Sequence, residues 1–304
     1  MKRNRIIIIF LTIVVLSTSI YSYAYYYEPK TISITCNHIK SKNIPNGFQG
    51  VKIVQFSDTH LGPNFTHEQL IKLVNQINRL NPDIVVFTGD LVDNFAEYGS
   101  QRKQVQPILA QIHAKLGKYA VFGNHDRGGG GSYLFKRGDV ENSPYKRFIE
   151  GAGFTVLVNK INKITAANGD QITIAGLDDL LLGEPRVQNT LQQLNPKDFN
   201  LLLVHEPDVA DEVREFPVDF QISGHSHGGQ VQLPFGKLMI STSLGKKYIE
   251  GLYSLEGKRK NLQLYVNRGI GTTRARLRFL CKPELSVFVL QQTDNNRQSE
   301  TKCS

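Results

Sequence analysis

Short hydrophobic runs recur along this chain, and each has the length of a buried strand. They are rich in valine, isoleucine, leucine and phenylalanine, and they cover residues 51–57, 85–88, 119–122, 201–204 and 220–223. Continuous apolar runs of this kind are typical of strands that are covered on both faces of a sheet. The pattern therefore predicts an α/β architecture with these runs as its central strands.

Helical and alternating patterns fill the intervals between these runs. Residues 66–79 carry an apolar stripe at helical spacing, and Thr66 with Gln69 fits a capping box. We expect two more helices at residues 105–116 and 145–150 and a hairpin joining 161–166 to 171–175. After His227 the pattern predicts strands of a second sheet at residues 228–233, 248–255, 262–266 and 285–290.

The first 28 residues differ from the rest of the chain. Lys2, Arg3 and Arg5 precede residues 6–27, which carry no charge and end in a cluster of tyrosines. A helix over these residues would be about 33 Å long, enough to cross the hydrocarbon core of a bilayer. We expect three regions: an N-terminal transmembrane anchor or signal peptide at 1–28, a catalytic domain at 29–292 and a polar C-terminal tail at 293–304.

Two locations follow from this segment. Because basic residues flank the cytoplasmic end of a span, we expect a single-pass protein of the cell membrane with an extracytoplasmic catalytic domain. The alternative is a secreted or periplasmic protein released by cleavage after Ala24, since Ser22 and Ala24 are small residues at alternate positions.

Ligand-type side chains follow each of the predicted central strands. They are Asp58 and His60, Asp90, Asn124 with His125 and Asp126, His205, and His225 with His227. In open α/β sheets, ligands bind beyond the carboxyl ends of the strands, so these side chains should converge on one crevice.

The chemistry of these side chains indicates metal ions. Seven of them offer imidazole nitrogens and carboxylate or amide oxygens without a thiolate: Asp58, His60, Asp90, Asn124, His205, His225 and His227. This mixture suits Mn, Fe or Zn, and seven ligands are too many for one ion. If Asp90 contributes to both of two divalent ions, the pair forms the clamp, about 3.5 to 4 Å apart, that promotes in-line attack on phosphorus.

The net charge of +9 does not by itself indicate a nucleic-acid partner. Residues 258–260 are basic and lie between two predicted strands, as in a solvated turn. Arg274, Arg276 and Arg278 either form a solvated edge or place positive charge near an anionic substrate. Because no aromatic stacking pattern or groove-reading helix accompanies these charges, a nucleic-acid role is not favoured.

Two further features leave alternatives open. The three cysteines include Cys36 and Cys281, which we expect either to pair in an exported protein or to stay as buried free thiols. The glycines at 128–131 form either a flexible connection or a bare backbone that lets a bulky group approach, with Arg127 or Tyr133 available to bind it.

The ordered blocks from Asp58 to His227 resemble the calcineurin-like metallophosphoesterases. The blocks are Asp-x-His, Gly-Asp, Gly-Asn-His-Asp, an isolated His and Gly-His-x-His. The resemblance is greatest to a bacterial membrane-associated branch, which shares the Gly176-Leu177-Asp178-Asp179 turn and the Asn267-Arg268-Gly269 segment. It implies a four-layer sandwich of two mixed β-sheets flanked by helices.

The resemblance also implies roles for individual residues. It assigns Asp58, His60 and His227 to one metal ion and Asn124, His205 and His225 to the other, with Asp90 shared. His125 is similar to the family's histidine that contacts the phosphate or protonates the leaving group, and we expect Asp126 to orient it. Purple acid phosphatases place a tyrosine three residues after the shared aspartate, whereas Asp93 occupies that position here.

The expected function is hydrolysis of a phosphodiester or phosphomonoester by attack of a metal-bridging hydroxide. The anchor suggests a lipid-linked or cell-envelope substrate. One alternative is a pyrophosphohydrolase of a nucleotide-activated acylated sugar, although such donors are cytoplasmic. A metal-binding scaffold without activity is the non-enzyme alternative.

Overall fold

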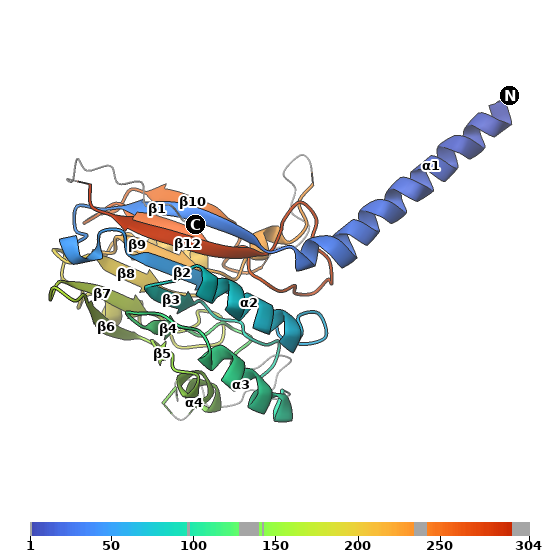
Figure 1. The fold of residues 1–304 in the computed structure, drawn as a ribbon. Helices are drawn as coiled ribbons and strands as arrows, with labels where there is room; N and C mark the ends of the chain where they lie inside the picture. Colours follow the sequence, from blue (N-terminus) through green and yellow to red (C-terminus); the bar gives the residue numbers. More distant parts are fainter. Residues whose placement is uncertain (1, 96–97, 128–139, 142, 234–241, 294–304) are drawn as a thin grey trace.

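The computed structural model describes residues 2–95, 98–127, 140–141, 143–233 and 242–293, and it contains two mixed sheets packed face to face (Figure 1). The first sheet has the order β1-β12-β2-β3-β4-β5 and the second β10-β11-β9-β8-β7-β6. The strands of the first sheet are β1 (Ser33–Lys40), β12 (Glu284–Gln291), β2 (Lys52–Phe56), β3 (Ile84–Phe87), β4 (Lys118–Ala120) and β5 (Thr155–Val156). Those of the second are β10 (Gly251–Leu255), β11 (Leu262–Val266), β9 (Phe220–Ser223), β8 (Asn200–Leu203), β7 (Gln171–Gly176) and β6 (Lys160–Thr165).

Helices cover the outer face of each sheet. The first sheet is covered by α2 (His67–Arg79), α3 (Arg102–Ala110) and α4 (Pro144–Gly151), and the second by the short helices α5 (Val187–Leu191) and α6 (Ala210–Val213). Thr66 caps α2 through the expected capping box with Gln69. Short helical turns occur at Asn46–Phe48, Gly99–Gln101, Pro207–Val209 and His227–Gly229.

Three hydrophobic clusters separate the four layers. Along β2, Ile53 packs between the two sheets while its neighbour Val54 packs under the helices. The same alternation puts Leu201 between the sheets and Leu202 against the second pair of helices. Because successive strand residues point to opposite faces, strands that are apolar throughout are required in the middle of a four-layer sandwich.

Three predicted elements differ from the structure. Residues 228–233 form no strand, because Gly228, Gly229 and Gln230 have φ angles of 60°, 73° and 56°, which an extended strand excludes. The helix predicted at 105–116 begins three residues earlier and ends at Ala110. The strand predicted at 285–290 exists as β12, but it belongs to the first sheet, where it pairs with β1 and β2.

The N-terminal segment extends away from the sandwich (Figure 1). Helix α1 (Lys2–Ser22) continues into a π-helical turn (Tyr23–Tyr27) and a 3-10 turn (Glu28–Lys30). Within the described residues, 2–30 form the one helix that is long and apolar enough to cross a membrane. None of its apolar part is buried against the rest of the protein. The length and composition of this helix suit a membrane anchor.

The expected pairing of Cys36 with Cys281 is wrong. Cys281 is a buried free thiol whose Sγ lies 3.4 Å from the carbonyl oxygens of His227 and Gly228, to which it donates. Burial raises the pKa of the Cys281 thiol, so it stays protonated at neutral pH.

Candidate metal centre

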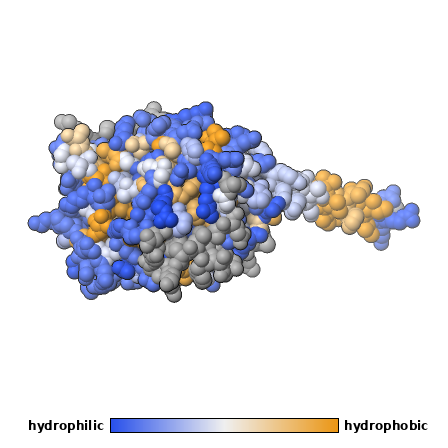
Figure 2. All heavy atoms as spheres, turned by 90° about the horizontal axis from the view of Figure 1, so that it is seen from below, coloured by the Kyte–Doolittle hydropathy of each residue, from blue (hydrophilic) through white to orange (hydrophobic). Residues whose placement is uncertain are grey.

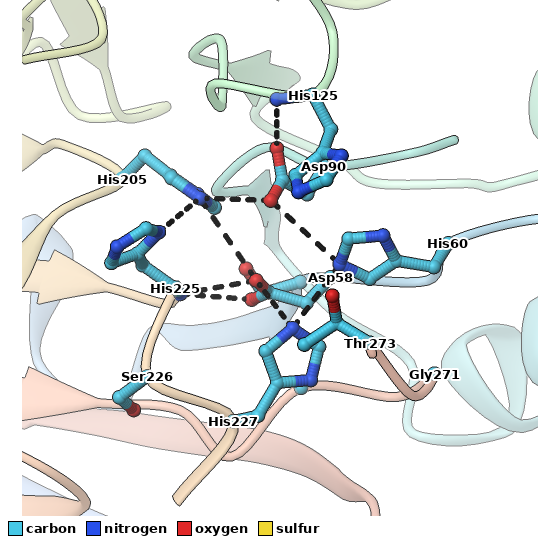
Figure 3. A network of polar contacts seen from close by, with 12 residues as sticks. Asp58, His60, Asp90, His125, His205, His225, Ser226, His227, Gly271 and Thr273 are labelled. Carbon is cyan, nitrogen blue, oxygen red and sulfur yellow. Dashed lines mark hydrogen bonds and ion pairs between the residues drawn. The ribbon is translucent and has the colours of Figure 1, made fainter. Parts of the chain in front are cut away.

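The ligand-type residues converge at the carboxyl ends of the central strands of both sheets (Figure 3). Asp58 and His60 follow β2, Asp90 follows β3, and Asn124 follows β4. From the second sheet, His205 follows β8, and His225 and His227 follow β9. The two carboxylates and four ligand-type histidines are buried, so the two sheets together enclose one polar site within an apolar sandwich.

The backbone at five of the ligand-type residues is in the left-handed region, which residues other than glycine rarely adopt. The φ angles are 51° at Asp58, 43° at His60, 59° at Asp90, 69° at His225 and 52° at His227. Non-glycine residues in this left-handed region cost energy and persist where the surrounding structure requires them, most often at functional sites. Five such residues in one cluster mark it as the functional centre of the fold.

Glycines next to the ligands make room for their carboxylates. A Cβ at Gly123 would lie 2.2 Å from Asp90 Oδ1, and one at Gly224 would lie 2.4 Å from Asp58 Oδ2. Both distances are far below van der Waals contact. The glycines of the Gly-Asn-His and Gly-His-Ser-His blocks are therefore required by close approach to the two carboxylates.

One group of ligand atoms comes from Asp58, His60 and His227, whose donor atoms all lie within 4.8 Å of one another. His60 Nε2 lies 3.1 Å from His227 Nε2, and His227 Nε2 lies 3.4 Å from Asp58 Oδ1. Asp90 Oδ2 is 3.7 Å from His60 Nε2. These three donors, with the Asp90 carboxylate beside His60, suit a transition metal ion.

A second group is formed by Asp90, His205 and His225. His205 Nε2 lies 3.1 Å from Asp90 Oδ2 and 3.1 Å from His225 Nδ1. Asn124 Oδ1 is buried without a hydrogen-bond partner and its residue lines the same cavity. A buried amide oxygen without a donor is costly, and a cation would satisfy it. The donors therefore fit two divalent ions that share Asp90.

Hydrogen bonds on the far side of three rings fix which nitrogen faces the cavity. His205 Nδ1 lies 2.6 Å from the carbonyl oxygen of Thr88, and His225 Nε2 lies 2.6 Å from that of Ser243. Each of these nitrogens donates its proton, which leaves the other ring nitrogen with a lone pair for a metal ion. His60 Nδ1 lies 2.7 Å from Asp93 Oδ1 in the same way.

Sequence reasoning missed these partners for a definite reason. Asp93 stands in the sequence where purple acid phosphatases have a tyrosine, and Ser243 acts through its backbone carbonyl, which no side-chain pattern reveals. The partners of imidazole ligands are set by loop geometry.

The lowered pKa values of two of the histidines, His225 and His227, suit ligand chemistry. Burial, together with positive charge on His205, lowers the pKa of His225 to about 4. Burial and the nearby His60 lower the pKa of His227 well below its usual value. Both rings are therefore neutral at pH 7, the state in which imidazole binds a metal ion.

His125 lies beside the two groups but is held differently from the expectation. Its Nδ1 donates to the carbonyl oxygen of Asp93 at 2.9 Å, and its ring packs edge-on against His60. Asp126 does not orient this ring. Its carboxylate accepts from the backbone N–H groups of Asp90, Leu91 and Gly123 at 2.8 to 2.9 Å, so Asp126 positions the loop of the shared aspartate instead.

Two arginines singled out in the sequence are buried away from the cavity lining. Arg127 is 3% exposed and its Nε donates to Asp178 Oδ1 at 3.1 Å, which ties it to the turn at residues 176–179. Arg278 is fully buried and donates to the carbonyl oxygens of Arg268, Gly269 and Gly271. Neither the solvated edge nor the substrate contact expected for Arg278 is correct, whereas Arg274 does line the cavity.

The cavity between the two groups has a volume of about 100 Å³. Besides the ligands and His125, its lining includes Leu181, Thr242, Thr273 and Arg274. A space of this size at the shared aspartate accommodates a phosphate-sized group, and the larger part of any substrate must lie outside it. The residues at 128–131 and Tyr133 lie outside the described residues.

Comparison with known proteins agrees with this site. Residues 51–229 match the family model of calcineurin-like phosphoesterases, and the chain belongs to this family of metal-dependent phosphoester hydrolases. It is 46% identical over 274 residues to the uncharacterized metallophosphoesterase YkuE of Bacillus subtilis, covering 90% of this chain and 91% of the relative.

Two further relatives carry membrane or lipid terms in their names. The chain is 28% identical to the UDP-2,3-diacylglucosamine pyrophosphatase LpxG of Chlamydia trachomatis, covering 88% of this chain and 91% of the relative. It is 30% identical to a transmembrane protein with a metallophosphoesterase domain of Danio rerio, covering 87% of this chain and 58% of the relative.

Proposed function

We propose that the described cluster holds two divalent cations with a defined set of ligands. Asp58, His60 and His227 bind one, Asn124, His205 and His225 bind the other, and Asp90 binds both. The orphaned Asn124 Oδ1 and the two neutral imidazoles of His225 and His227 support this assignment. Mixed nitrogen and oxygen donors without sulfur favour Mn, Fe or Zn.

When bound, such a pair supplies a water-derived nucleophile at neutral pH and neutralises charge on the phosphoryl oxygens. The chain supplies the remaining functions. His125 lies on the cavity wall beside His60. Its Nδ1 donates to the Asp93 carbonyl oxygen, so Nε2 is the ring nitrogen available to substrate. We infer that His125, when its ring carries a second proton on Nε2, donates a hydrogen bond from Nε2 to a phosphoryl oxygen or gives that proton to the leaving oxygen.

Arg127 was expected to bind substrate, and its ion pair with Asp178 supports a different role. The guanidinium also lies 5.4 Å from the centre of the Phe122 ring. These contacts hold the strand that leads to Asn124 against the turn at 176–179. We infer that Arg127 acts on substrate binding only through the position of Asn124.

The test of this function is hydrolysis of bis(p-nitrophenyl) and mono(p-nitrophenyl) phosphate by the purified full chain with added Mn. We expect release of p-nitrophenol that stops on chelation and returns when Mn is restored. Absence of hydrolysis with Mn, Fe or Zn would remove the hydrolase function and favour a metal-binding scaffold.

A second candidate is cleavage of a pyrophosphate in a nucleotide-activated acylated sugar. It is supported by the likeness to LpxG over most of both chains. The relative rates on a UDP-linked diacylated sugar and on bis(p-nitrophenyl) phosphate distinguish the two. A preference of more than about tenfold for the UDP-linked compound would favour the pyrophosphohydrolase.

We propose that the anchor is retained and that the catalytic domain is extracytoplasmic. Lys2, Arg3 and Arg5 precede the span, which favours a cytoplasmic N-terminus. Ala24, the expected cleavage site, is 5% exposed and its carbonyl oxygen accepts from Arg278 N at 2.9 Å, which supports a chain that stays joined at this point. Protease treatment of intact spheroplasts should digest the domain. Protection would reverse the orientation.

A further inference from the structure

The anchor enters the sandwich at the edge that carries the metal centre. Strand β1 pairs with β12 in parallel, and β12 pairs with β2 in antiparallel orientation, so β1 begins where β2 ends. Asp58 and His60 lie just beyond that end of β2. Only Thr31 and Ile32 separate the last helical turn of the anchor from β1, so the membrane segment ends beside the ligand loops.

No linker separates the anchor from the catalytic domain. The Glu28 side chain is 1% exposed and its carboxylate accepts from the backbone N–H groups of Leu280 and Cys281. The ring of Tyr23 packs edge-on against Phe279, with 6.5 Å between ring centres. Contacts to the domain begin at Tyr23, directly after α1. The domain is therefore held close to the membrane surface from which the helix emerges.

The distance from the anchor to the cavity is short. Arg274 lines the metal cavity, and Arg278, four residues later, donates its backbone N–H to the anchor at Ala24. Four residues span at most about 14 Å. The polar layer of a bilayer is about 5 to 8 Å deep on each side. The wall of the cavity therefore lies at most about 14 Å from the end of the anchor, along the backbone from Arg278 to Arg274.

The side chains around the anchor suit a lipid surface. Leu280 is 54% exposed and Leu233 is 39% exposed, and exposed Arg276 and Lys282 lie near Leu280 in the chain. Tyr26 and Tyr27 are exposed at the end of the span, as expected for an interfacial belt. Figure 2 shows this belt as the pale segment between the orange apolar part of the helix and the body. Basic residues among exposed apolar ones match anionic headgroups.

We propose that the catalytic edge lies against the bilayer and that the metal cavity acts on a phosphate-bearing amphiphile resident in the membrane. The inference rests on the proposed hydrolase function and adds the substrate class and the surface that presents it. Leu280 and Leu233 contact the apolar boundary, and the reacting phosphate stays at headgroup depth. A substrate confined to the same bilayer also gains effective concentration.

The experiment compares two substrates with the same reacting group. The full chain is reconstituted in phosphatidylcholine vesicles that contain a minority of phosphatidylglycerol, and it is given either ethyl p-nitrophenyl phosphate or hexadecyl p-nitrophenyl phosphate. The first is soluble in water and the second is held in the bilayer. We expect kcat/KM to be at least about tenfold higher for the hexadecyl ester.

Variants at the rim separate membrane contact from chemistry. Leu280→Asp places a charge at the lipid surface and should lower hydrolysis of the hexadecyl ester about threefold or more while leaving the ethyl ester unchanged. Unchanged hydrolysis of the ethyl ester also shows that the variant is folded. Asn261→Asp adds the same charge in the exposed turn before β11, at the opposite edge, and should change neither rate.

Each outcome decides the proposal. Equal kcat/KM for the two esters, or a loss in Leu280→Asp that affects both equally, overturns it while the hydrolase function stands. If the unmodified chain hydrolyses neither ester, the proposed function fails, and this inference fails with it.

Discussion

The two sheets contribute different chemistry to one site. The first sheet supplies both carboxylates and the amide, through Asp58, Asp90 and Asn124, together with one imidazole. The second supplies imidazoles alone, through His205, His225 and His227. The carboxylate charge of the site therefore comes from the first sheet, and the second sheet contributes imidazoles.

The loops of the two sheets are also held from different directions. In the first sheet a buried carboxylate, Asp126, accepts three backbone N–H groups of the ligand loops. In the second, the loop of His227 is held from outside, by Cys281 Sγ on the carbonyls of His227 and Gly228. Cys281 is in turn held by Glu28 of the anchor. One loop of the second sheet, that of His227, is therefore linked to the N-terminal segment through Cys281.

Removing the shared ligand should have the largest effect. Asp90→Ala takes a donor from both groups, so we expect kcat/KM on bis(p-nitrophenyl) phosphate to fall on the order of 10³-fold or more. Bound metal per chain, measured by mass spectrometry of the elements, should fall for both ions. His225→Ala removes a donor from one group and should deplete one ion only.

The matched control for these variants is His113→Ala, an exposed histidine outside the site, which should change neither metal content nor rate. Equal metal content in Asp90→Ala and the unmodified chain would contradict the assignment of Asp90 to both ions. Equal depletion in Asp90→Ala and His225→Ala would remove the distinction between the two sheets.

His125→Ala should leave both ions in place. His125 belongs to the first sheet but is not assigned as a ligand, so we expect kcat to fall about 10²- to 10⁴-fold while metal content stays unchanged. The measurement is turnover and metal content on the same preparation. Loss of an ion would identify His125 as a ligand. This outcome is a real alternative, because the donor atoms of His125, His60 and Asp90 also lie within 4.8 Å of one another.

The sequence predicted the metal-ligand residues better than it predicted the groups that hold the ligand loops in place. Ligand side chains follow apolar strands in a pattern that is visible in one dimension, and the structure brings Asp58, Asp90 and His225 together as expected. The role of Asp126 was predicted wrongly because a carboxylate that binds backbone N–H groups leaves no pattern of residue types. The place of β12 beside β1 depends on contacts about 250 residues apart, which local periodicity cannot contain.

Asp126→Asn should weaken the first sheet's ligand loop. An amide keeps one oxygen for the N–H groups of Asp90 and Gly123 but presents its NH2 group to the N–H of Leu91, so one buried donor loses its partner, at a cost of about 1 to 3 kcal/mol. Urea unfolding measures this loss. Asp211→Asn, which breaks a surface pair with Lys247, should cost less than about 1 kcal/mol. Equal losses in the two variants would contradict the role given to Asp126.

Glu28→Gln tests the outer support of the second sheet. The Gln side chain keeps one oxygen for the N–H of Cys281, but its amide nitrogen faces the N–H of Leu280, which loses its acceptor. We therefore expect the free energy of unfolding to fall by about 1 kcal/mol and Tm to fall by about 2 to 4 °C. The exposed Glu256→Gln is the control and should change Tm by less. Since the altered contact reaches His227 through Cys281, kcat should also fall in Glu28→Gln. A lowered Tm with unchanged kcat would show that the anchor stabilises the domain without positioning the metal centre.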